Sequence, residues 1–175
     1  MKIVKQSVEI MDKLDGKEIL KKLELAGRVC YKSEDRIGEG TAEKFVKAII
    51  DRGHESVLEH VSITVKFIVD RGVSHQLVRH RIASYSQEST RYCNYSKDRF
   101  GGSVVFVQPS FAVEGTEGYD IWKKSCEESE KAYFDLLAHG WTPEQARSVL
   151  PHSIKTEVVA TMNIRQWRHF IKLRT

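Results

Sequence analysis

The sequence contains little cysteine, little proline and no long apolar run. Its 175 residues include three cysteines and three prolines. Cys30, Cys93 and Cys126 lie far apart and form no C-x-x-C pair, which argues against a disulfide framework or a thiolate metal site and favours a reducing compartment. No apolar stretch approaches the length of a membrane span, and the N-terminus lacks the apolar region of a signal peptide. We therefore expect a cytoplasmic protein with no membrane partner.

The excess of positive charge is also small. Lysine and arginine number 28 against 24 aspartates and glutamates, so the formal net charge is +4 at pH 7. This mild excess suits an anionic partner but falls short of the basic surface of a dedicated nucleic-acid binder. With 41% hydrophobic and 30% charged residues, the chain has the composition of an ordinary globular protein. It has no internal repeat, low-complexity tract or linker, so we expect one domain over residues 1–175.

Strand and helix signals alternate along the chain and predict a mixed α/β (α+β) fold, in which a mixed sheet is flanked by helices. The clearest strand is residues 61–69, where apolar and polar side chains alternate. The predicted strands are residues 4–12, 61–69, 103–109 and 156–162. The predicted helices are residues 16–31, 41–53, 73–83, 117–140, 142–151 and 163–174.

Several predicted helices have clear end signals. Thr41 is a plausible N-cap, and Gly53 suits the position that follows a helix. Thr142 and Gln145 are spaced as a capping box around a proline at the first helical position. Asn163 is the expected N-cap of the last helix.

The last predicted helix carries two faces. Ile164, Trp167 and Ile171 follow one another at helical spacing and are expected to form its buried face. Arg165 and His169 share another face, because they lie four residues apart. The sequence alone favours a solvated basic face and a ligand-facing one equally.

The stretch RHRIASYSQESTRY, residues 79–92, is too rich in charge for a core element. If the helix of residues 73–83 is regular, Arg79, His80 and Arg81 point in directions about 100° apart and cannot form one cationic face. The hydroxyl and amide groups that follow favour a loop over a helix. Such a loop, together with Arg91, suits phosphate oxygens and a planar polar ring. Three solvated cations on an exposed helix end are the alternative.

Two other chemistries find little support. HESVLEH, residues 54–60, resembles the zinc motif H-E-x-x-H, but Leu58 stands where the second histidine would be, so we expect no metal site. Cys93 is the thiol nearest the polar loop, yet nothing distinguishes it from a small buried cysteine. No glycine-rich phosphate loop is present.

The spacing R-H-R-x7-S, from Arg79 to Ser89, resembles the signature of flavin-dependent thymidylate synthases. HESVLEH upstream, and QARSVLP and NIRQWRHFIKLRT downstream, are similar to motifs of that family in the same order. The resemblance implies reductive methylation of dUMP to dTMP, with methylenetetrahydrofolate as one-carbon donor and NADPH as reductant through FAD. It also implies a homotetramer whose active sites are shared between subunits, and no metal.

The resemblance further implies which residues bind and react. The residues expected to contact FAD are Ser56, Glu59, Arg79, His80, Arg81, Gln87, Asn163, Arg165 and His169. The residues expected to hold dUMP are Gln76, Leu77, Val78, Arg79, Gln87, Glu88, Ser89, Thr90, Arg91, Arg147 and Arg174. The expected catalytic residues are Arg174, which polarises the uracil ring, Ser89, and His54 near the flavin.

One departure from the family concerns the end of the sequence. Family members usually continue beyond Leu-Arg-Thr, so we expect this chain to lack a C-terminal segment that helps to close the site. A catalytically impaired family member that binds nucleotide is therefore one alternative. A basic nucleic-acid-binding module, built on Arg79, Arg81, Arg91 and the last helix, is the other, although the leading hypothesis includes no nucleic-acid partner.

Overall fold

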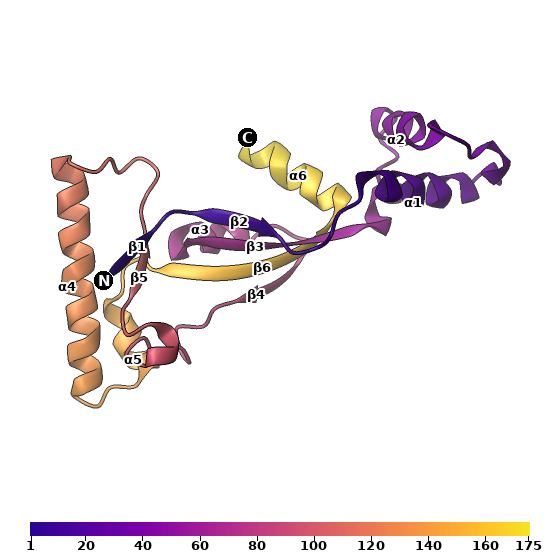
Figure 1. Ribbon diagram of the computed structural model, residues 1–175. Helices are drawn as coiled ribbons and strands as arrows, with labels where there is room; N and C mark the ends of the chain where they lie inside the picture. The colour runs from indigo at the N-terminus through magenta and orange to yellow at the C-terminus, as the bar shows by residue number, and fades with distance from the viewer. The chain divides into compact units, whose positions relative to one another are not determined.

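The computed structural model describes residues 1–98 and 100–175, and strands and helices are interspersed along the chain (Figure 1). The strands are β1 (Lys2–Val4), β2 (Ser7–Ile10), β3 (Ser62–Asp70), β4 (Ser84–Gln87), β5 (Val105–Val107) and β6 (Lys155–Asn163). The α-helices are α1 (Gly16–Val29), α2 (Thr41–Asp51), α3 (Arg71–Leu77), α4 (Glu117–Ala138), α5 (Pro143–Ala146) and α6 (Ile164–Arg174). The 3₁₀ helices are η1 (Glu34–Arg36), η2 (Glu55–His60), η3 (Asp98–Phe100) and η4 (Arg147–Val149). The prediction of a mixed α/β fold is confirmed.

The strands form two sheets. The larger has the order β2-β3-β6-β4, and β1 pairs with β5 in a separate parallel ribbon. In β6 the side chains alternate strictly between buried and half-buried, as expected for a strand with one face on a core. None of the helices within the described residues is long and apolar enough to cross a membrane.

The chain forms two compact units. Unit 1 comprises Met1–Glu9, Lys66–Arg79 and Tyr85–Val159. Unit 2 comprises Ile10–Val65, His80–Ser84 and Ala160–Thr175. Both β3 and β6 therefore begin in one unit and end in the other.

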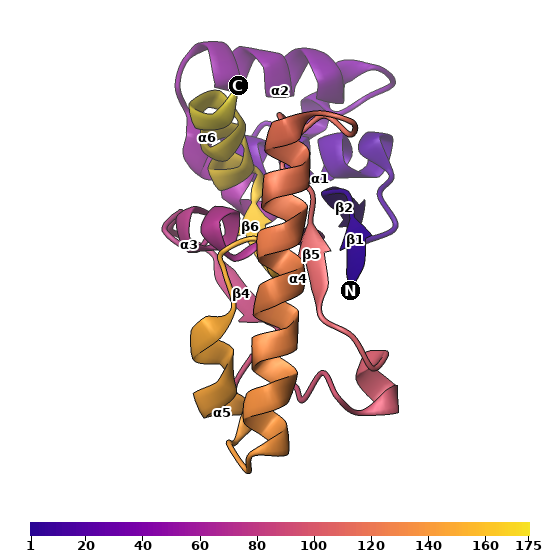
Figure 2. The ribbon, with the colours of Figure 1, turned by 90° about the vertical axis from the view of Figure 1, so that its left-hand side faces the viewer.

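The core of unit 1 includes side chains of the long helix α4, which runs beside β5 and ends near α5 (Figure 2). Glu130 on α4 fixes this position, because its carboxylate accepts from the Val104 N–H at 2.8 Å and pairs with the N-terminal amine at 2.8 Å. The buried members of this core are Tyr95, Val104, Phe106, Cys126, Tyr133, Ala146 and Ile154.

Unit 2 has a smaller core, formed where α1, α2 and η2 pack together; α1 and α2 lie side by side in Figure 1. Its charged member is Glu24, which is 1% exposed. The Glu24 carboxylate pairs with Arg28 at 2.7 Å and accepts from the Thr41 hydroxyl at 2.9 Å, so its charge is compensated. The buried apolar residues are Leu23, Val46, Ile49, Leu58 and Val61.

Two predictions near the N-terminal half need correction. The single strand expected at residues 4–12 is two strands, because the chain leaves β1 after Val4 and joins a different sheet at Ser7. The N-cap of α2 is Gly40, in the left-handed conformation with φ 70°. Thr41 is the first helical residue instead, and its hydroxyl accepts from the Gly38 N–H.

The predicted helix 73–83 is also wrong in its second half. It ends at Leu77, and the Leu77 carbonyl accepts a hydrogen bond of 2.9 Å from the Tyr85 hydroxyl. In a longer helix that carbonyl would accept from the Arg81 N–H, so Tyr85 takes the place of the next helical bond. The hydroxyl-rich segment after it, predicted as a loop, begins with the strand β4, which pairs with β6.

The end signals of the last two helices are confirmed. The Thr142 hydroxyl accepts from the Gln145 N–H, and the Gln145 side chain accepts from the Thr142 N–H, which completes the capping box. The Asn163 side chain caps α6. The buried face predicted for α6 is wrong for Ile171, which is 55% exposed, and Ile164 and Trp167 are only half-buried.

Candidate active site

Unit 2 contains a cavity of about 770 Å³ bordered by η2, by residues 81–82 and by α6. Five of the residues expected to contact FAD line it: Glu59, Arg81, Asn163, Arg165 and His169. These residues come from three segments that are far apart in the sequence. The fold therefore collects them around one space.

The wall formed by α6 is held in place by its first turns. The Asn163 side chain accepts from the Gln166 N–H at 2.9 Å, and the Ile164 N–H donates to the Val61 carbonyl at 2.9 Å. The Trp167 indole N–H donates to the Ile63 carbonyl at 3.0 Å. Side chains on the cavity face of α6 thus extend from a fixed backbone.

The cavity carries more positive than negative charge. Its lining includes four cationic side chains, Arg81, Arg165, Arg168 and Lys172, and two carboxylates, Glu55 and Glu59. Arg165 pairs with Glu59 at 2.6 Å and with Glu55 at 3.5 Å, and the hydrogen bond to Glu59 raises the pKa of Arg165.

These features fit a phosphate-bearing flavin. The volume is within the range of cofactor sites, and excess cations at a cavity wall suit phosphate oxygens. The amides of Asn163 and Gln166 belong to the same lining and offer donors and acceptors for a polar ring.

Next to this group in unit 2, His80 and Arg174 form a pair. The Arg174 Nε donates to the His80 Nε2 at 3.0 Å, and the His80 ring contacts Phe170 edge-on with centroids 4.7 Å apart. His80 is 8% exposed. Burial lowers the pKa of His80, and the charges of Arg174 and His169 lower it further. His80 is therefore neutral, with an acceptor nitrogen directed at Arg174.

His54 and Ser56 lie at the start of η2 and are exposed. His54 occupies the N-cap position of η2 but makes no capping side-chain bond. Neither residue is part of the cavity lining. Their predicted contacts with flavin stay predictions.

Unit 1 brings together four of the residues expected to hold dUMP. The Arg147 Nη1 donates to the Thr90 hydroxyl at 3.1 Å. Arg91 pairs with Glu144 at 2.8 Å, and Arg147 lies 4.0 Å from the same carboxylate oxygen. Ser89 shapes the loop, because its hydroxyl accepts from the Arg91 N–H at 3.3 Å. Two arginines expected to bind one phosphate thus share one carboxylate.

Thr90 and Arg147 also line a small cavity of about 180 Å³ in unit 1. Arg71, His75 and His152 contribute further nitrogen atoms to its lining. Arg147 is carried by η4, directly after the capped helix α5. The cap at Thr142 therefore positions this cation.

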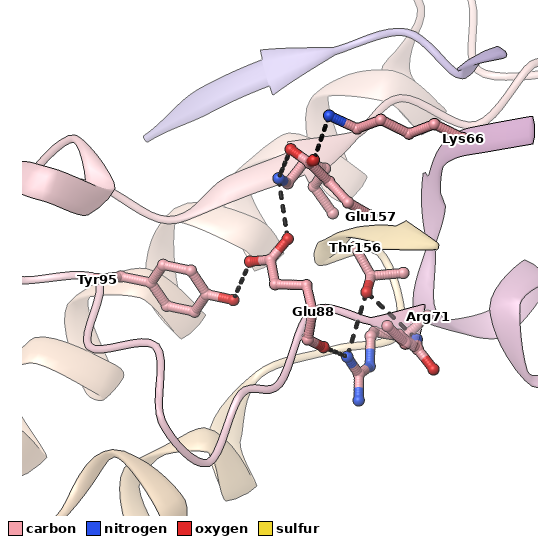
Figure 3. A network of polar contacts seen from close by, with 8 residues as sticks. Lys66, Arg71, Glu88, Tyr95, Thr156 and Glu157 are labelled. Carbon is pink, nitrogen blue, oxygen red and sulfur yellow. Dashed lines mark hydrogen bonds and ion pairs between the residues drawn. The ribbon is translucent and has the colours of Figure 1, made fainter. Parts of the chain in front are cut away.

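The side chain of Glu88 bonds to other residues of unit 1 (Figure 3). Its Oε1 accepts from the Tyr95 hydroxyl at 2.9 Å, and its Oε2 pairs with Lys155 at 2.9 Å. Lys155 also pairs with Glu157 at 2.8 Å, and Glu157 pairs with Lys66 at 2.6 Å. This network joins β3, β6 and the residue that follows β4, and it anchors the start of the predicted phosphate loop.

The charges in this network shift one another's pKa values. Hydrogen bonds from Lys155 and Lys66 lower the pKa of Glu157. Burial lowers the pKa of Lys155, but its bonds to Glu157 and Glu88 outweigh that effect and raise it overall. Burial, with the neighbouring Glu88 charge, raises the pKa of Tyr95. Glu157 and Lys155 therefore stay charged at neutral pH, and Tyr95 stays a neutral donor.

Gln87 has a similar internal role. Its side-chain NH₂ donates to the Ser74 hydroxyl at 2.9 Å and to the Thr156 hydroxyl at 3.2 Å. Both acceptors are fully buried. An amide has two N–H donors, so these two bonds use both donors of the Gln87 side chain, and its predicted contacts with FAD and dUMP stay predictions.

The remaining predicted residues lie at the end of α3 in unit 1. Gln76 and Arg79 are exposed, and Val78 is half-buried. Leu77 is buried, and its carbonyl is the acceptor for Tyr85. The contacts of these four residues with dUMP stay predictions.

Sequence reasoning missed two groups of polar residues. One is the network partners Tyr95, Lys155 and Glu157, whose partners are distant in sequence and left no local signal. The other is Arg168 and Lys172, which line the cavity in unit 2. Their positions three and seven residues after Arg165 place them on one helical face, so the sequence did contain that signal. Within the described residues, no group of histidine, cysteine, aspartate or glutamate is arranged to hold a metal ion.

The chain belongs to a known family. Residues 10–175 match the family described as thymidylate synthase complementing protein. The flavin-dependent thymidylate synthase of Pyrococcus furiosus is 40% identical over 149 residues, which cover 85% of this chain and 60% of that protein. The Geobacter sulfurreducens enzyme of the same name is 37% identical over 157 residues, which cover 86% of this chain and 66% of that protein. The chain spans 57–60% of the length of similar enzymes from Pyrococcus furiosus, Pyrococcus abyssi and Thermococcus onnurineus.

A solved structure shares the whole fold. The crystal structure of a UMP/dUMP methylase, PolB from Streptomyces cacaoi, bound with 5-Br dUMP, superposes with a TM-score of 0.82. The two sequences are 26% identical, and the match covers 100% of this chain and 80% of that one. A second structure of the same methylase, bound with 5-Br UMP, has a TM-score of 0.77.

Proposed function

We propose that this chain acts as a flavin-dependent thymidylate synthase, which methylates dUMP to dTMP. Methylenetetrahydrofolate is the one-carbon donor, and NADPH is the reductant through FAD. The observation that carries the proposal is the cavity in unit 2, where five of the residues expected to contact FAD meet. The names of the relatives and of the methylase support the substrate class.

In this proposal Arg81, Asn163 and Arg165 hold the flavin. When bound there, FAD would supply the redox chemistry that links NADPH to the one-carbon unit. The chain's own contribution is binding and orientation, because the donors on α6 extend from a backbone that Asn163 and Trp167 hold in place.

Thr90, Arg91 and Arg147 hold the phosphate of dUMP in unit 1. Both arginines exchange the Glu144 carboxylate for phosphate oxygens, which carry more charge and suit the guanidinium fork. The Ser89 hydroxyl shapes the same loop.

Arg174 polarises the uracil ring. A guanidinium stabilises negative charge that develops on the ring. His80 orients this guanidinium, because its neutral Nε2 accepts from the Arg174 Nε. No cysteine nucleophile takes part in the proposal.

The proposal includes the assembly. Residues 1–175 act as one functional domain, since β3 and β6 each continue from one unit into the other. We also propose a homotetramer with shared active sites, which rests on the family resemblance. The proposed cytoplasmic location rests on the three scattered cysteines.

Visible spectroscopy tests the flavin and the substrate together. Purified chain incubated with FAD is expected to retain an oxidised-flavin spectrum after gel filtration, and dUMP is expected to perturb it. Release of tritium from C5-labelled dUMP, with methylenetetrahydrofolate and NADPH, then measures turnover. Absence of flavin binding refutes the proposal. If the chain binds flavin and dUMP but releases no tritium, it is a family member that binds nucleotide without turnover, and the synthase activity is refuted.

A further inference from the structure

One face of α6 carries more basic groups than the predicted flavin contacts require. Arg165, Arg168, His169 and Lys172 follow one another at i, i+3, i+4 and i+7, and all four line the cavity in unit 2. Arg165 and His169 belong to the set expected to contact FAD. Arg168 and Lys172 do not, and so far they have no role.

Glu55 lies between two of these cations. One of its carboxylate oxygens is 3.5 Å from the Arg165 Nε, and the other is 3.9 Å from the Arg168 Nε. These distances are longer than those of good charge-assisted hydrogen bonds. The 2.6 Å bond between Arg165 and Glu59 is much closer. Glu55 therefore compensates the charge of both arginines without binding either tightly.

The geometry suits an anion that replaces a carboxylate. A phosphate carries more acceptor oxygens than a carboxylate and can be held by the planar fork of each guanidinium. The lining has four cations against two carboxylates, which leaves an excess of positive charge for a ligand. The two anionic phosphates of a dinucleotide match that excess.

We propose that Arg165, Arg168 and Lys172 bind the diphosphate of the bound dinucleotide, and that Glu55 is an internal counter-ion which the diphosphate displaces. This inference rests on the proposed function for the identity of the dinucleotide as FAD. It adds two phosphate-binding residues, Arg168 and Lys172, to the site, and it identifies Glu55 as the group that competes with the diphosphate.

The inference predicts effects of opposite sign from neighbouring residues. A double variant, Arg168→Gln with Lys172→Gln, removes both cations. It weakens FAD binding by about tenfold or more, since two charge-assisted contacts are lost. Removing the negative charge in Glu55→Gln tightens FAD binding by about threefold, because the arginines no longer exchange a counter-ion. A residue that only supports the fold would not tighten binding when it is changed.

The experiment is a fluorescence titration of the full chain with FAD and, separately, with riboflavin, which has no phosphate. Lys124→Gln on α4 is the matched control, because Lys124 is an exposed lysine in unit 1. We expect the double variant and Glu55→Gln to shift the affinity for FAD in opposite directions and to leave that for riboflavin within about twofold. An equal loss for both flavins, or no change for FAD in either variant, overturns the inference.

Inorganic pyrophosphate separates this inference from the proposed function. If the wild-type chain binds FAD but the variants do not alter its affinity, the diphosphate site is refuted and the flavin assignment stands. If the chain binds pyrophosphate at the α6 face but no flavin, the phosphate site stands and the proposed function fails. Binding of neither probe refutes both.

Discussion

Arginine side chains in both candidate sites are paired with glutamates. Arg91 and Arg147 share Glu144 in unit 1, and Arg165 is paired with Glu55 and Glu59 in unit 2. Such pairs are exposed enough for salt to screen them. Binding of a phosphate at either site is therefore an exchange of counter-ions, and its affinity depends on ionic strength.

The dUMP site offers a direct test of this exchange. Arg91→Ala is expected to weaken dUMP binding by about 1.5–3 kcal/mol, the scale of a hydrogen bond to a charged group. Isothermal titration calorimetry at low and moderate salt measures it, and the loss is expected to shrink as salt rises.

Arg52→Ala is the control for this prediction, because Arg52 is an exposed arginine at the end of α2 in unit 2. It is expected to leave the affinity for dUMP unchanged. Unaltered affinity in Arg91→Ala would mean that the phosphate binds elsewhere.

Single residues also show where sequence reasoning succeeds. The sequence predicts that Arg165 and His169 share a face, and both line one cavity, because helical spacing determines which side chains are neighbours. The pairing of Glu88 with Tyr95 and Lys155 could not be predicted in this way. Those contacts depend on how separate strands pair, which no local pattern specifies.

At the scale of elements, α5 is a short helix whose position depends on its cap. It spans only Pro143–Ala146, and the Thr142 capping box satisfies its first free N–H groups. Arg147 follows at once in η4 and bonds to Thr90. The cap therefore links local helix chemistry to the predicted phosphate site.

Thr142→Ala is expected to lower the free energy of unfolding by about 1 kcal/mol, the usual effect of losing an N-cap side chain. It is also expected to weaken dUMP binding, since Arg147 becomes less well placed. Urea unfolding and calorimetry measure the two effects. Thr142→Ser keeps the hydroxyl and should retain both properties; a loss of stability in Thr142→Ala with unchanged dUMP affinity would contradict the link.

The same elements explain which parts of the fold could be predicted. The helices α1, α4, α5 and α6 have caps and apolar spacing within their own sequence, so the sequence predicts that they exist. It does not predict the end of α3, because the Leu77 carbonyl bonds to Tyr85 beyond the helix. Likewise β4 is a strand through its pairing with β6, which overrides the loop preference of its serines.

At the scale of the whole molecule, the two units carry different acid-sensitive groups. His80 belongs to unit 2 and has a pKa lowered from 6.5, mainly by burial. Glu157 belongs to unit 1 and has a pKa lowered from 4.5 by hydrogen bonds from Lys155 and Lys66. In both cases the unfolded chain takes up the proton first as the pH falls. The stabilisation is therefore present in full above the unfolded pKa and is lost as the pH falls through the folded pKa.

Acidification is expected to destabilise unit 2 at a higher pH than unit 1. The contribution of His80 to unit 2 declines as the pH falls below 6.5, whereas the contribution of Glu157 to unit 1 declines only below 4.5. For a single proton the slope is at most about 1.4 kcal/mol per pH unit. Hydrogen exchange with mass spectrometry, corrected for intrinsic rates, measures the protection of α2 in unit 2 and of α4 in unit 1 separately.

His80→Gln removes the titrating group while keeping an acceptor for Arg174. Between about pH 7.5 and pH 5.5, the wild-type chain should lose protection in α2, because the unfolded chain takes up a proton at His80 more readily than the folded unit 2 does. Protection in α4 of unit 1 should be kept, because Glu157 titrates at lower pH. The variant should keep the same α2 protection at both pH values, since a glutamine side chain does not titrate. Equal loss of protection in α2 and α4 of the wild-type chain, or a loss of α2 protection in His80→Gln as large as in the wild-type chain, would show that His80 does not govern the acid stability of unit 2.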